Sequence, residues 1–482
     1  MSGLTPAAQA FAVAVFVGDV PAVVVVPTDA DVERMTADAR FFIAALHGAA
    51  ETTVARTVLP LPSQEIDPYR GIVPHLDVAS ARARALTTLA RGTAQVVVVS
   101  AAGLLPRLSA PERLLRAAVE FHTGGTLSPI DLADRLADAG FTREDPVDAH
   151  GEFCMRGGVV DVFPVGDTHP IRAEFAGDTI ESLRRFDSAT QRSVTTIKRA
   201  SVFPLRERFE TMSDDGAVVD RSATFFDYLA YQSARIIVSE PVDTMARLEQ
   251  VAEQIRTSHT DALARGETAL APQALQVDVE DVRAWLDRAT TLNTLGLDDG
   301  SPHVSSQPTV VIRGRLRDWV DEVKRGCARG DTQLFVAATE GRAGRIIELL
   351  AENDLIGVSI DTAEDTHTAA VLVATGELSH GFRLPEAALQ VYVEADLFED
   401  ERHVRQRRRS VAKSFLSDFR DLKVGNHVVH VEHGIGEFVG LKTLVVDTAS
   451  HEFMELRYAG AAKLFVPVEH LDLLQKYTGA AG

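Results

Sequence analysis

Residues Ala22–Leu46 read AVVVVPTDADVERMTADARFFIAAL, and this stretch decides the fold of the first domain. Its valine run stops at Pro27, and after Thr28-Asp29 the apolar residues recur at helical spacing. A second helical stretch leads to another β-branched run, QVVVVS at Gln95–Ser100. Strand–helix–strand units with such runs predict a parallel sheet that is buried on both faces.

The composition limits the classes of protein to which the chain can belong. The chain has 482 residues, 45% hydrophobic and 24% charged, which predicts three or four globular domains at roughly 100–200 residues each. Its 49 Lys+Arg against 69 Asp+Glu give a formal charge of -20, which disfavours wrapping duplex DNA. Docking on a basic protein patch and simple solubility both remain open as meanings of this charge.

The cysteines and the hydropathy of the sequence indicate the cellular compartment. Cys154 and Cys327 are the two cysteines, and their spacing forms neither a disulfide framework nor a metal signature. Apolar runs fall short of the ~18 residues that a membrane helix needs. We therefore expect a cytoplasmic protein without a membrane segment.

From about Phe121 the pattern changes to an α+β module. Ser128–Phe141 (SPIDLADRLADAGF) predicts a helix with Ser-Pro at its start. The β segments Glu152–Gly166 and Pro170–Asp187 follow, with turns expected at Gly157-Gly158, Gly166-Asp167 and Gly177-Asp178. The module is expected to be an insertion into the first α/β unit.

The rhythm of strands and helices then returns. A strand is expected at Ala234–Val238, whereas residues 272–308 carry weak signals that predict no definite elements. Beyond Pro308, strands TVVI, TQLFVAAT, AAVLVAT and LQVYVEAD, with the helix EGRAGRIIELLAEND among them, predict a further small α/β domain.

Several catalytic motifs are missing from the sequence. There is no G-x-x-x-x-G-K-[ST] loop, and Pro27-Thr28-Asp29-Ala30-Asp31 stands at the expected place, where its carboxylates would repel a triphosphate. The α/β units are thus predicted to be degenerate, P-loop-like folds. No serine-hydrolase elbow or HExxH site occurs either. We expect no catalytic residues, cofactor or metal in this chain.

The last 60 or so residues are dense in β signals and predict a small β-barrel-like domain. His427 and His433 would share a strand face but lie roughly 20 Å apart at ~3.3 Å per residue, so metal binding is disfavoured. Gly434 and Gly436 are read as a turn or bulge, or as a rim that a partner backbone approaches. Lys442–Val446, bounded by the turn 447–450, is read as an edge strand that can pair with another protein.

Two blocks carry a family resemblance. Asp421–Leu444 (DLKVGNHVVHVEHGIGEFVGLKTL), with KLFVPVEHLDLL downstream, resembles the RNA-polymerase-interaction domain of bacterial transcription-repair coupling factors and the CarD-like (Tudor-like) module. His150–Ser193, together with LPSQEIDPYRGIVPH and ASARARAL upstream, resembles the segment that these factors share with the excision-repair protein UvrB.

The resemblance implies partners and site residues. The UvrB-like module implies UvrA binding through a polar β surface, at Arg156, Arg172, Glu174 and Phe175, because guanidinium forks suit carboxylates on a partner. Plain solvation of Arg156 and Arg172 remains an alternative. The C-terminal module implies binding to the RNA polymerase β subunit by strand pairing at Lys442, Thr443, Leu444 and Val445. A core role for Leu444 also remains open.

The resemblance further implies that the intact family member continues into ATP- and Mg-dependent motor domains that translocate on DNA. We therefore expect a monomeric, non-catalytic N-terminal portion that meets DNA only indirectly. The basic run 401–410 is either a solvated linker helix or a nucleic-acid contact. The rival hypotheses are a stand-alone CarD-like transcription regulator and a degenerate nucleotide-fold ATPase.

The predicted architecture is a multidomain α/β protein with an inserted α+β module and a C-terminal β domain. The expected boundaries are listed here with their domains: 1–116, first part of the UvrB-like α/β domain; 117–202, UvrA-binding-like insertion; 203–307, second part of the α/β domain; 308–398, small α/β domain; 399–420, basic linker helix; and 421–482, polymerase-interaction domain.

Overall fold

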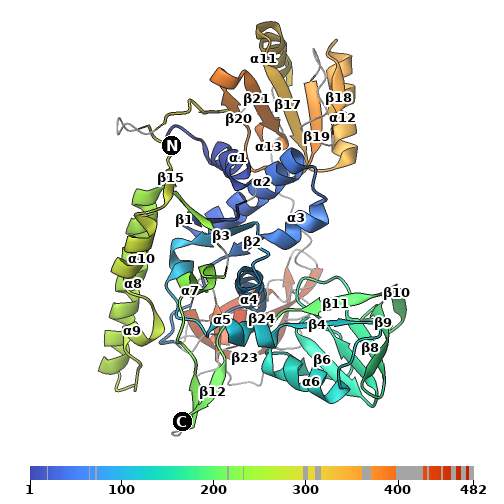
Figure 1. The fold of residues 1–482 in the computed structure, drawn as a ribbon, viewed down its shortest axis with the longest axis vertical. Coiled ribbons are helices and arrows are strands. Elements are labelled where there is room, and N and C mark those ends of the chain that lie inside the picture. Colours follow the sequence, from blue (N-terminus) through green and yellow to red (C-terminus); the bar gives the residue numbers. More distant parts are fainter. Residues whose placement is uncertain are drawn as a thin grey trace. The chain divides into compact units, whose positions relative to one another are not determined.

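The computed structural model describes most of residues 1–397 and the strands of a C-terminal sheet (Figure 1). Its gaps are residues 19, 65, 71–72, 214–215, 232, 297–301, 310–315, 361–370, 398–426, 431–433, 447–448, 458–462, 468–473 and 477–482. The basic run 401–410 lies outside the described residues. The chain divides into two compact units, 1–65 with 74–399, and 66–73 with 400–482.

A five-stranded parallel sheet forms the centre of the first α/β domain. Its strand order is β15-β14-β1-β3-β2, with β1 (Ala22–Val26) in the middle. The other strands are β2 (Val58–Leu61), β3 (Val96–Ser100), β14 (Arg235–Ser239) and β15 (Thr290–Leu292). Every residue of β1 and β3 is buried, as the valine runs predicted. The strand expected at Ala234–Val238 lies one residue further along.

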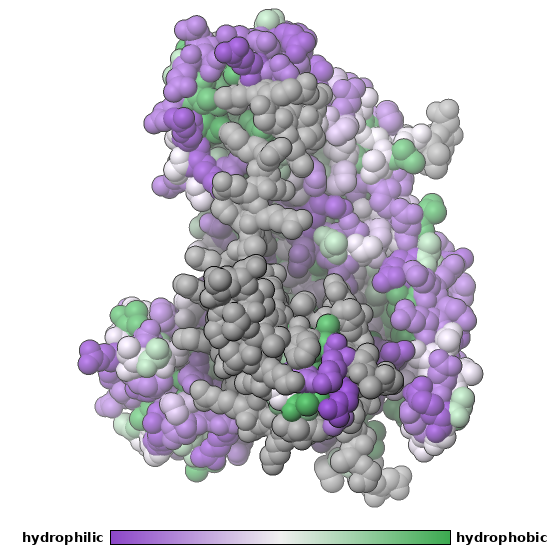
Figure 2. Space-filling model, turned by 180° about the vertical axis from the view of Figure 1, so that it is seen from behind, coloured by the Kyte–Doolittle hydropathy of each residue, from purple (hydrophilic) through white to green (hydrophobic). Residues whose placement is uncertain are grey.

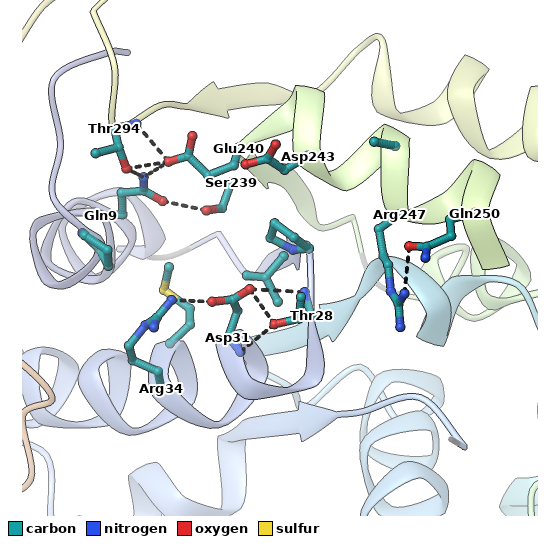
Figure 3. A pocket seen from close by; sticks show the side chains of 15 residues that line it. Gln9, Thr28, Asp31, Arg34, Ser239, Glu240, Asp243, Arg247, Gln250 and Thr294 are labelled. Carbon is teal, nitrogen blue, oxygen red and sulfur yellow. Dashed lines mark hydrogen bonds and ion pairs between the residues drawn. The ribbon is translucent and has the colours of Figure 1, made fainter. Parts of the chain in front are cut away.

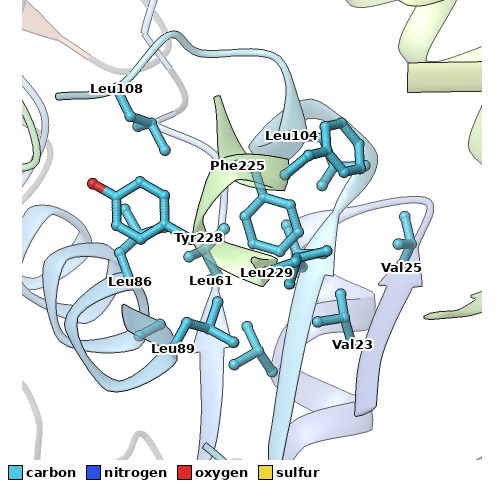
Figure 4. Close-up of a cluster of buried hydrophobic side chains, with 14 of the residues drawn as sticks. Val23, Val25, Leu61, Leu86, Leu89, Leu104, Leu108, Phe225, Tyr228 and Leu229 are labelled. Atoms are coloured by element: carbon cyan, nitrogen blue, oxygen red, sulfur yellow. The ribbon is translucent and has the colours of Figure 1, made fainter. Parts of the chain in front are cut away.

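Helices cover both faces of this sheet because alternate valines of β1 point to opposite sides. Val23 and Val25 join a core with α4 and α7 (Figure 4), to which α5, α8 and α10 also contribute, whereas Val24 and Val26 pack with α1, α2 and α3. The helices are α1 (Pro6–Val17), α2 (Asp29–His47), α3 (Glu51–Thr57), α4 (Leu76–Ala90), α5 (Pro111–Ala117), α7 (Phe225–Leu229), α8 (Pro241–Ala264) and α10 (Val279–Leu286).

The inserted module follows β3 and the 3₁₀ helix η1 (Ala101–Leu104). It contains helix α6 (Pro129–Asp138), capped by Ser128 as predicted, and a six-stranded sheet of order β10-β9-β8-β7-β6-β5. The strands are β5 (Thr142–Arg143), β6 (Glu152–Arg156), β7 (Val159–Val162), β8 (Ile171–Ala176), β9 (Thr179–Phe186) and β10 (Ser193–Ile197). The predicted turns are confirmed; Gly157 and Gly177, with φ of +59° and +61°, adopt a backbone that favours glycine.

Antiparallel strands β4 (Val119–His122) and β11 (Arg199–Val202) lie at the two ends of the module. After it come the hairpin β12 (Glu210–Ser213) and β13 (Gly216–Val219). Residues 272–308, for which the sequence predicted no elements, contain α9 (Pro272–Leu275), α10, β15 and β16 (Gln307–Pro308). These elements are short, so little periodicity could accumulate in them.

The small α/β domain has a mixed six-stranded sheet of order β16-β20-β21-β17-β19-β18. Its elements are α11 (Leu316–Arg329), β17 (Thr332–Ala337), α12 (Glu340–Glu352), β18 (Gly357–Ser359), β19 (Val371–Thr375), β20 (Phe382–Leu384), η2 (Pro385–Ala387), β21 (Leu389–Val393) and α13 (Glu394–Leu397). The prediction of a strand at residues 309–312 is wrong at Thr309, which belongs to no strand, and residues 310–312 lie outside the described part. The prediction that the strand LQVYVEAD continues through residues 394–396 is also wrong, because these residues belong to helix α13.

The C-terminal unit contains an antiparallel sheet of order β25-β24-β23-β22-β26. Its strands are β22 (His427–His430), β23 (Gly434–Val446), β24 (Ala449–Arg457), β25 (Lys463–Pro467) and β26 (Leu474–Lys476). Two predictions are corrected. Gly434 and Gly436 lie in regular pairing with β22, and the register shift occurs before Gly440; Ala449 and Ser450, predicted as turn, already belong to β24.

No helix in the described part of the chain is long and apolar enough to cross a membrane. From behind, the surface that Figure 2 colours is mainly hydrophilic, with small separate hydrophobic patches.

A buried ion pair connects the chain before and after the inserted module. Arg82 of α4 donates from Nε to Glu207, over 2.7 Å, and both side chains are at most 5% exposed. Arg82 also donates to the carbonyl oxygens of Pro62 and Gly103. The guanidinium thus joins α4, the segment after β2, η1 and the chain that returns from the module.

Replacing Arg82 with Ala is expected to lower the free energy of unfolding by about 3–5 kcal/mol, because Glu207 would stay buried without its cation. Urea denaturation checks this value. Arg256→Ala serves as the control, since its ion pair with Glu253 is more than half exposed on both sides and should contribute about 0–1 kcal/mol. Equal effects of the two substitutions would contradict the role given to Arg82.

Candidate functional site

The sheet of the inserted module has one apolar and one polar face. Phe153, Val160, Ala173 and Leu183 belong to the core that includes α6. The residues between them face the other way because strand side chains alternate. Cross-strand pairing then builds two rows on the polar face: Cys154, Asp161, Arg172 and Arg184, and beside it Arg156, Val159, Glu174 and Ser182.

Asp161 organises the first row. Its side chain is 1% exposed and receives two hydrogen bonds from Arg172, from Nε at 2.7 Å and from Nη2 at 2.8 Å. Arg156 adds a third, at 3.1 Å, and also lies 3.3 Å from Asp145. The hydrogen bond with Asp161 raises the pKa of Arg172, so the guanidinium stays charged. The guanidinium of Arg172 also lies 4.5 Å from the centre of the Phe186 ring.

Glu174 organises the second row. It accepts hydrogen bonds from Ser182, at 2.6 Å, and from Arg184, at 2.5 Å. The side chains of Arg156, Arg184 and Glu174 remain 48%, 39% and 32% exposed. These three are charged groups on this face that a partner can reach.

The structure changes the interpretation of the predicted residues. The bidentate fork of Arg172, expected to bind a carboxylate on a partner, binds Asp161 of the same chain, and its side chain is 20% exposed. Phe175 is half-buried against the apolar core, so it does not lie with the other three. Sequence reasoning missed Asp161 and Arg184, which the pairing of β7, β8 and β9 puts on the face of Arg172.

The second candidate site is the hairpin of β23 and β24. On one side β23 pairs with β24 from Glu437 to Val446, but on the other side β22 reaches only Gly434–Glu437. Residues 441–446, which include the predicted Lys442, Thr443, Leu444 and Val445, therefore have one edge without a partner among the described strands. The side chain of Leu444 lies outside the described part, so its possible core role stays open.

The strand ends of the first sheet form a third candidate, a cavity of about 460 Å³ between β1 and β14 (Figure 3). In open α/β sheets, ligands bind at this position. Here a capping box occupies the start of α2: Asp31 accepts from Thr28 N at 3.1 Å and Oγ1 at 2.7 Å, and pairs with Arg34. On the opposite wall, Glu240 accepts from Gln9 and Thr294, both at 2.8 Å.

No group of acidic, histidine or cysteine side chains suited to a metal ion occurs among the residues that the structure describes. Cys154 is buried and Cys327 half-buried, both as free thiols. Burial raises the pKa of each thiol, which disfavours the reactive thiolate.

Comparison with known proteins finds three domain families along the chain. Residues 119–207 match the UvrB interaction domain, 330–397 the D3 domain of MFD, and 422–478 the CarD-like/TRCF RID domain. The UvrB interaction match includes both rows of the polar face, and the RID match includes the hairpin.

Similar relatives are the transcription-repair-coupling factors of Bacillus subtilis (strain 168), Myxococcus xanthus and Escherichia coli (strain K12). They are 26%, 28% and 27% identical over 89%, 95% and 90% of this chain, which covers 41%, 44% and 42% of their own lengths. The chain thus spans less than half the length of these relatives. The three domain matches, in this order along the chain, and the similarity over most of its residues support an N-terminal portion of a transcription-repair-coupling factor.

Proposed function

We propose that this chain is the adaptor portion of a transcription-coupled nucleotide excision repair factor. It binds stalled RNA polymerase, through the β subunit, and recruits UvrA. The observation that supports this function is the presence, in one chain, of a polar sheet face in a UvrB-type module and, in an RID-type module, of a strand edge that has no partner among the described strands.

The UvrA contact is proposed on the exposed part of the polar face. Arg156, Arg184 and Glu174 supply it, while Asp161 fixes Arg172 and, through it, the shape of the face. Arg172 thus acts by positioning its neighbours. Phe175 contributes through the packing of β8 rather than by direct contact.

The polymerase contact is proposed along residues 442–445, where a strand of the β subunit would extend the sheet. Backbone N–H and C=O groups provide the affinity in such pairing, and Leu444 provides an apolar contact. Closure of the C-terminal sheet into a small barrel remains part of this proposal.

In the intact protein these contacts would serve an ATP-dependent translocase that displaces polymerase at lesions, with DNA met through the polymerase complex. The present chain is proposed to be monomeric and, given its two separate free thiols, cytoplasmic. The first sheet is proposed to be a degenerate P-loop-like unit without catalysis. The rival hypothesis of an ATPase requires that the strand-end cavity bind a nucleotide. The rival hypothesis of a CarD-like regulator assigns no role to the UvrB-type module.

The double substitution Arg156→Ala with Arg184→Ala is expected to weaken UvrA binding by about tenfold or more, because two exposed cations leave the contact surface. Pull-down and titration calorimetry with purified UvrA measure this. Arg256→Ala on α8 is the matched control, and polymerase binding should be unchanged in both proteins. Unchanged UvrA binding by the folded double variant would place the contact elsewhere.

Leu444→Arg is expected to abolish detectable binding of the full chain to the polymerase β subunit, since a charged side chain would enter an apolar strand contact. The same substitution at Leu474, in the terminal strand β26 of the sheet order, should leave binding intact. Circular dichroism establishes that both variants are folded. Equal loss in both variants would argue against a specific edge.

Purified chain is expected to show no ATP turnover above background in a phosphate-release assay. The physical reason is that Asp31 holds its carboxylate at the start of α2, where a phosphate group would otherwise bind. Turnover that disappears with Glu240→Gln would instead favour the ATPase hypothesis.

A further inference from the structure

A second cavity, of about 550 Å³, lies between the first α/β domain and the inserted module. One wall comes from the end of α3 and from α4, and the other from β4, β9 and β11 (Figure 1). Five arginines line it: Arg56, Arg84, Arg91, Arg185 and Arg199. We call it the arginine cavity.

The carboxylates of the arginine cavity are too few for its cations. Arg91 pairs with Glu120 at 2.5 Å, and Arg185 pairs with Asp167 at 3.2 Å. Glu120 and Asp167 are the two carboxylates that line the cavity, so three of its five arginines have no carboxylate partner there. Arg56, Arg84 and Arg199 form no ion pair within the described residues. A local excess of three positive charges stands out in a chain whose formal charge is -20.

The surroundings of Arg84 make its charged form unfavourable. Its Nε is buried and has no hydrogen-bond partner in the described structure, and its guanidinium lies 5.5 Å from the centre of the Phe203 ring. Arg91 lies at the same distance from that ring. Burial lowers the pKa of Arg84, the charge of Asp167 partly offsets this, and Arg56 lowers it further. Like charges held together at a half-buried position are unfavourable unless an anion joins them.

We propose that the arginine cavity binds a compact anion that carries at least two phosphoryl groups. Arginine forks match the oxygens of phosphoryl groups, and arginines on two opposing walls can hold both ends of such an anion. The three excess charges match the charge of a di- or triphosphate group.

The size and charge of the surroundings favour a small molecule over a nucleic-acid duplex. The volume lies in the range of about 300–1,000 Å³ that is typical of small-molecule sites. A duplex needs an extended basic surface, whereas this chain is acidic overall. Because its two walls belong to different domains, a bound anion would also hold the inserted module against the first α/β domain.

Titration calorimetry of the full chain with inorganic pyrophosphate at about 0.1 M salt tests the proposal. Saturable binding of one pyrophosphate is expected, with weaker binding of sulfate because sulfate offers one tetrahedral group. The double substitution Arg56→Ala with Arg199→Ala should weaken pyrophosphate binding by about tenfold or more. Both side chains are exposed, so the fold should be kept. Arg192→Ala, an exposed arginine of the same module outside the cavity, should bind like the parent.

Three results would overturn the proposal. They are the absence of binding, equal binding of sulfate and pyrophosphate, and equal losses in the double variant and Arg192→Ala. Binding of a short single-stranded oligonucleotide without binding of pyrophosphate would also overturn it, in favour of a nucleic-acid strand. UvrA and polymerase binding by the double variant should equal the parent's, so this test is separate from the adaptor function.

Discussion

The buried contact between Arg82 and Glu207 is the constraint on which the larger unit depends. A parallel sheet whose chain leaves after β3 and returns at β14 must hold together the two ends of the long excursion between them. Arg82 does this with one guanidinium, which no apolar residue could replace, since it satisfies Glu207 and two backbone carbonyls. Tyr228 supports the same junction by donating to the Ser109 carbonyl at 2.7 Å, and burial raises the pKa of its hydroxyl.

The same principle, a buried carboxylate that fixes cations, recurs on the polar face of the inserted module. Asp161 fixes Arg172 fully and Arg156 in part. An exposed charge contributes to recognition best when its side chain is already held in place, because less conformational entropy is lost on binding. A surface built in this way combines an internal frame with a few accessible groups.

Much of the fold could be predicted from the sequence where a single local rule governs the residue. The valine runs of β1 and β3, the Ser128 cap of α6 and the turn at Gly157 are of this kind. Features that depend on partners distant in the sequence could not be predicted. Examples are the short elements within 272–308 and the turn of the chain into α13 directly after β21.

The sequence predicted which strands carry the candidate site, but not which side chains form ion pairs within it. Arg172 was identified, but its carboxylate partner Asp161 lies on a neighbouring strand, and only the pairing of β7 with β8 reveals it. The open edge beside Leu444 follows a similar rule. The β-branched run predicts a strand, whereas the absence of a second partner for residues 441–446 among the described strands is a property of the sheet.

The capping box of α2 has a consequence for how the protein responds to its surroundings. Its counter-charge, Asp31, is covalently attached and is present at a constant effective concentration. A helix end that depends on a diffusible anion changes its stability as the supply of that anion changes. Helix α2 is insulated from such variation, so the stability of its first turn does not depend on the concentration of an anion in solution.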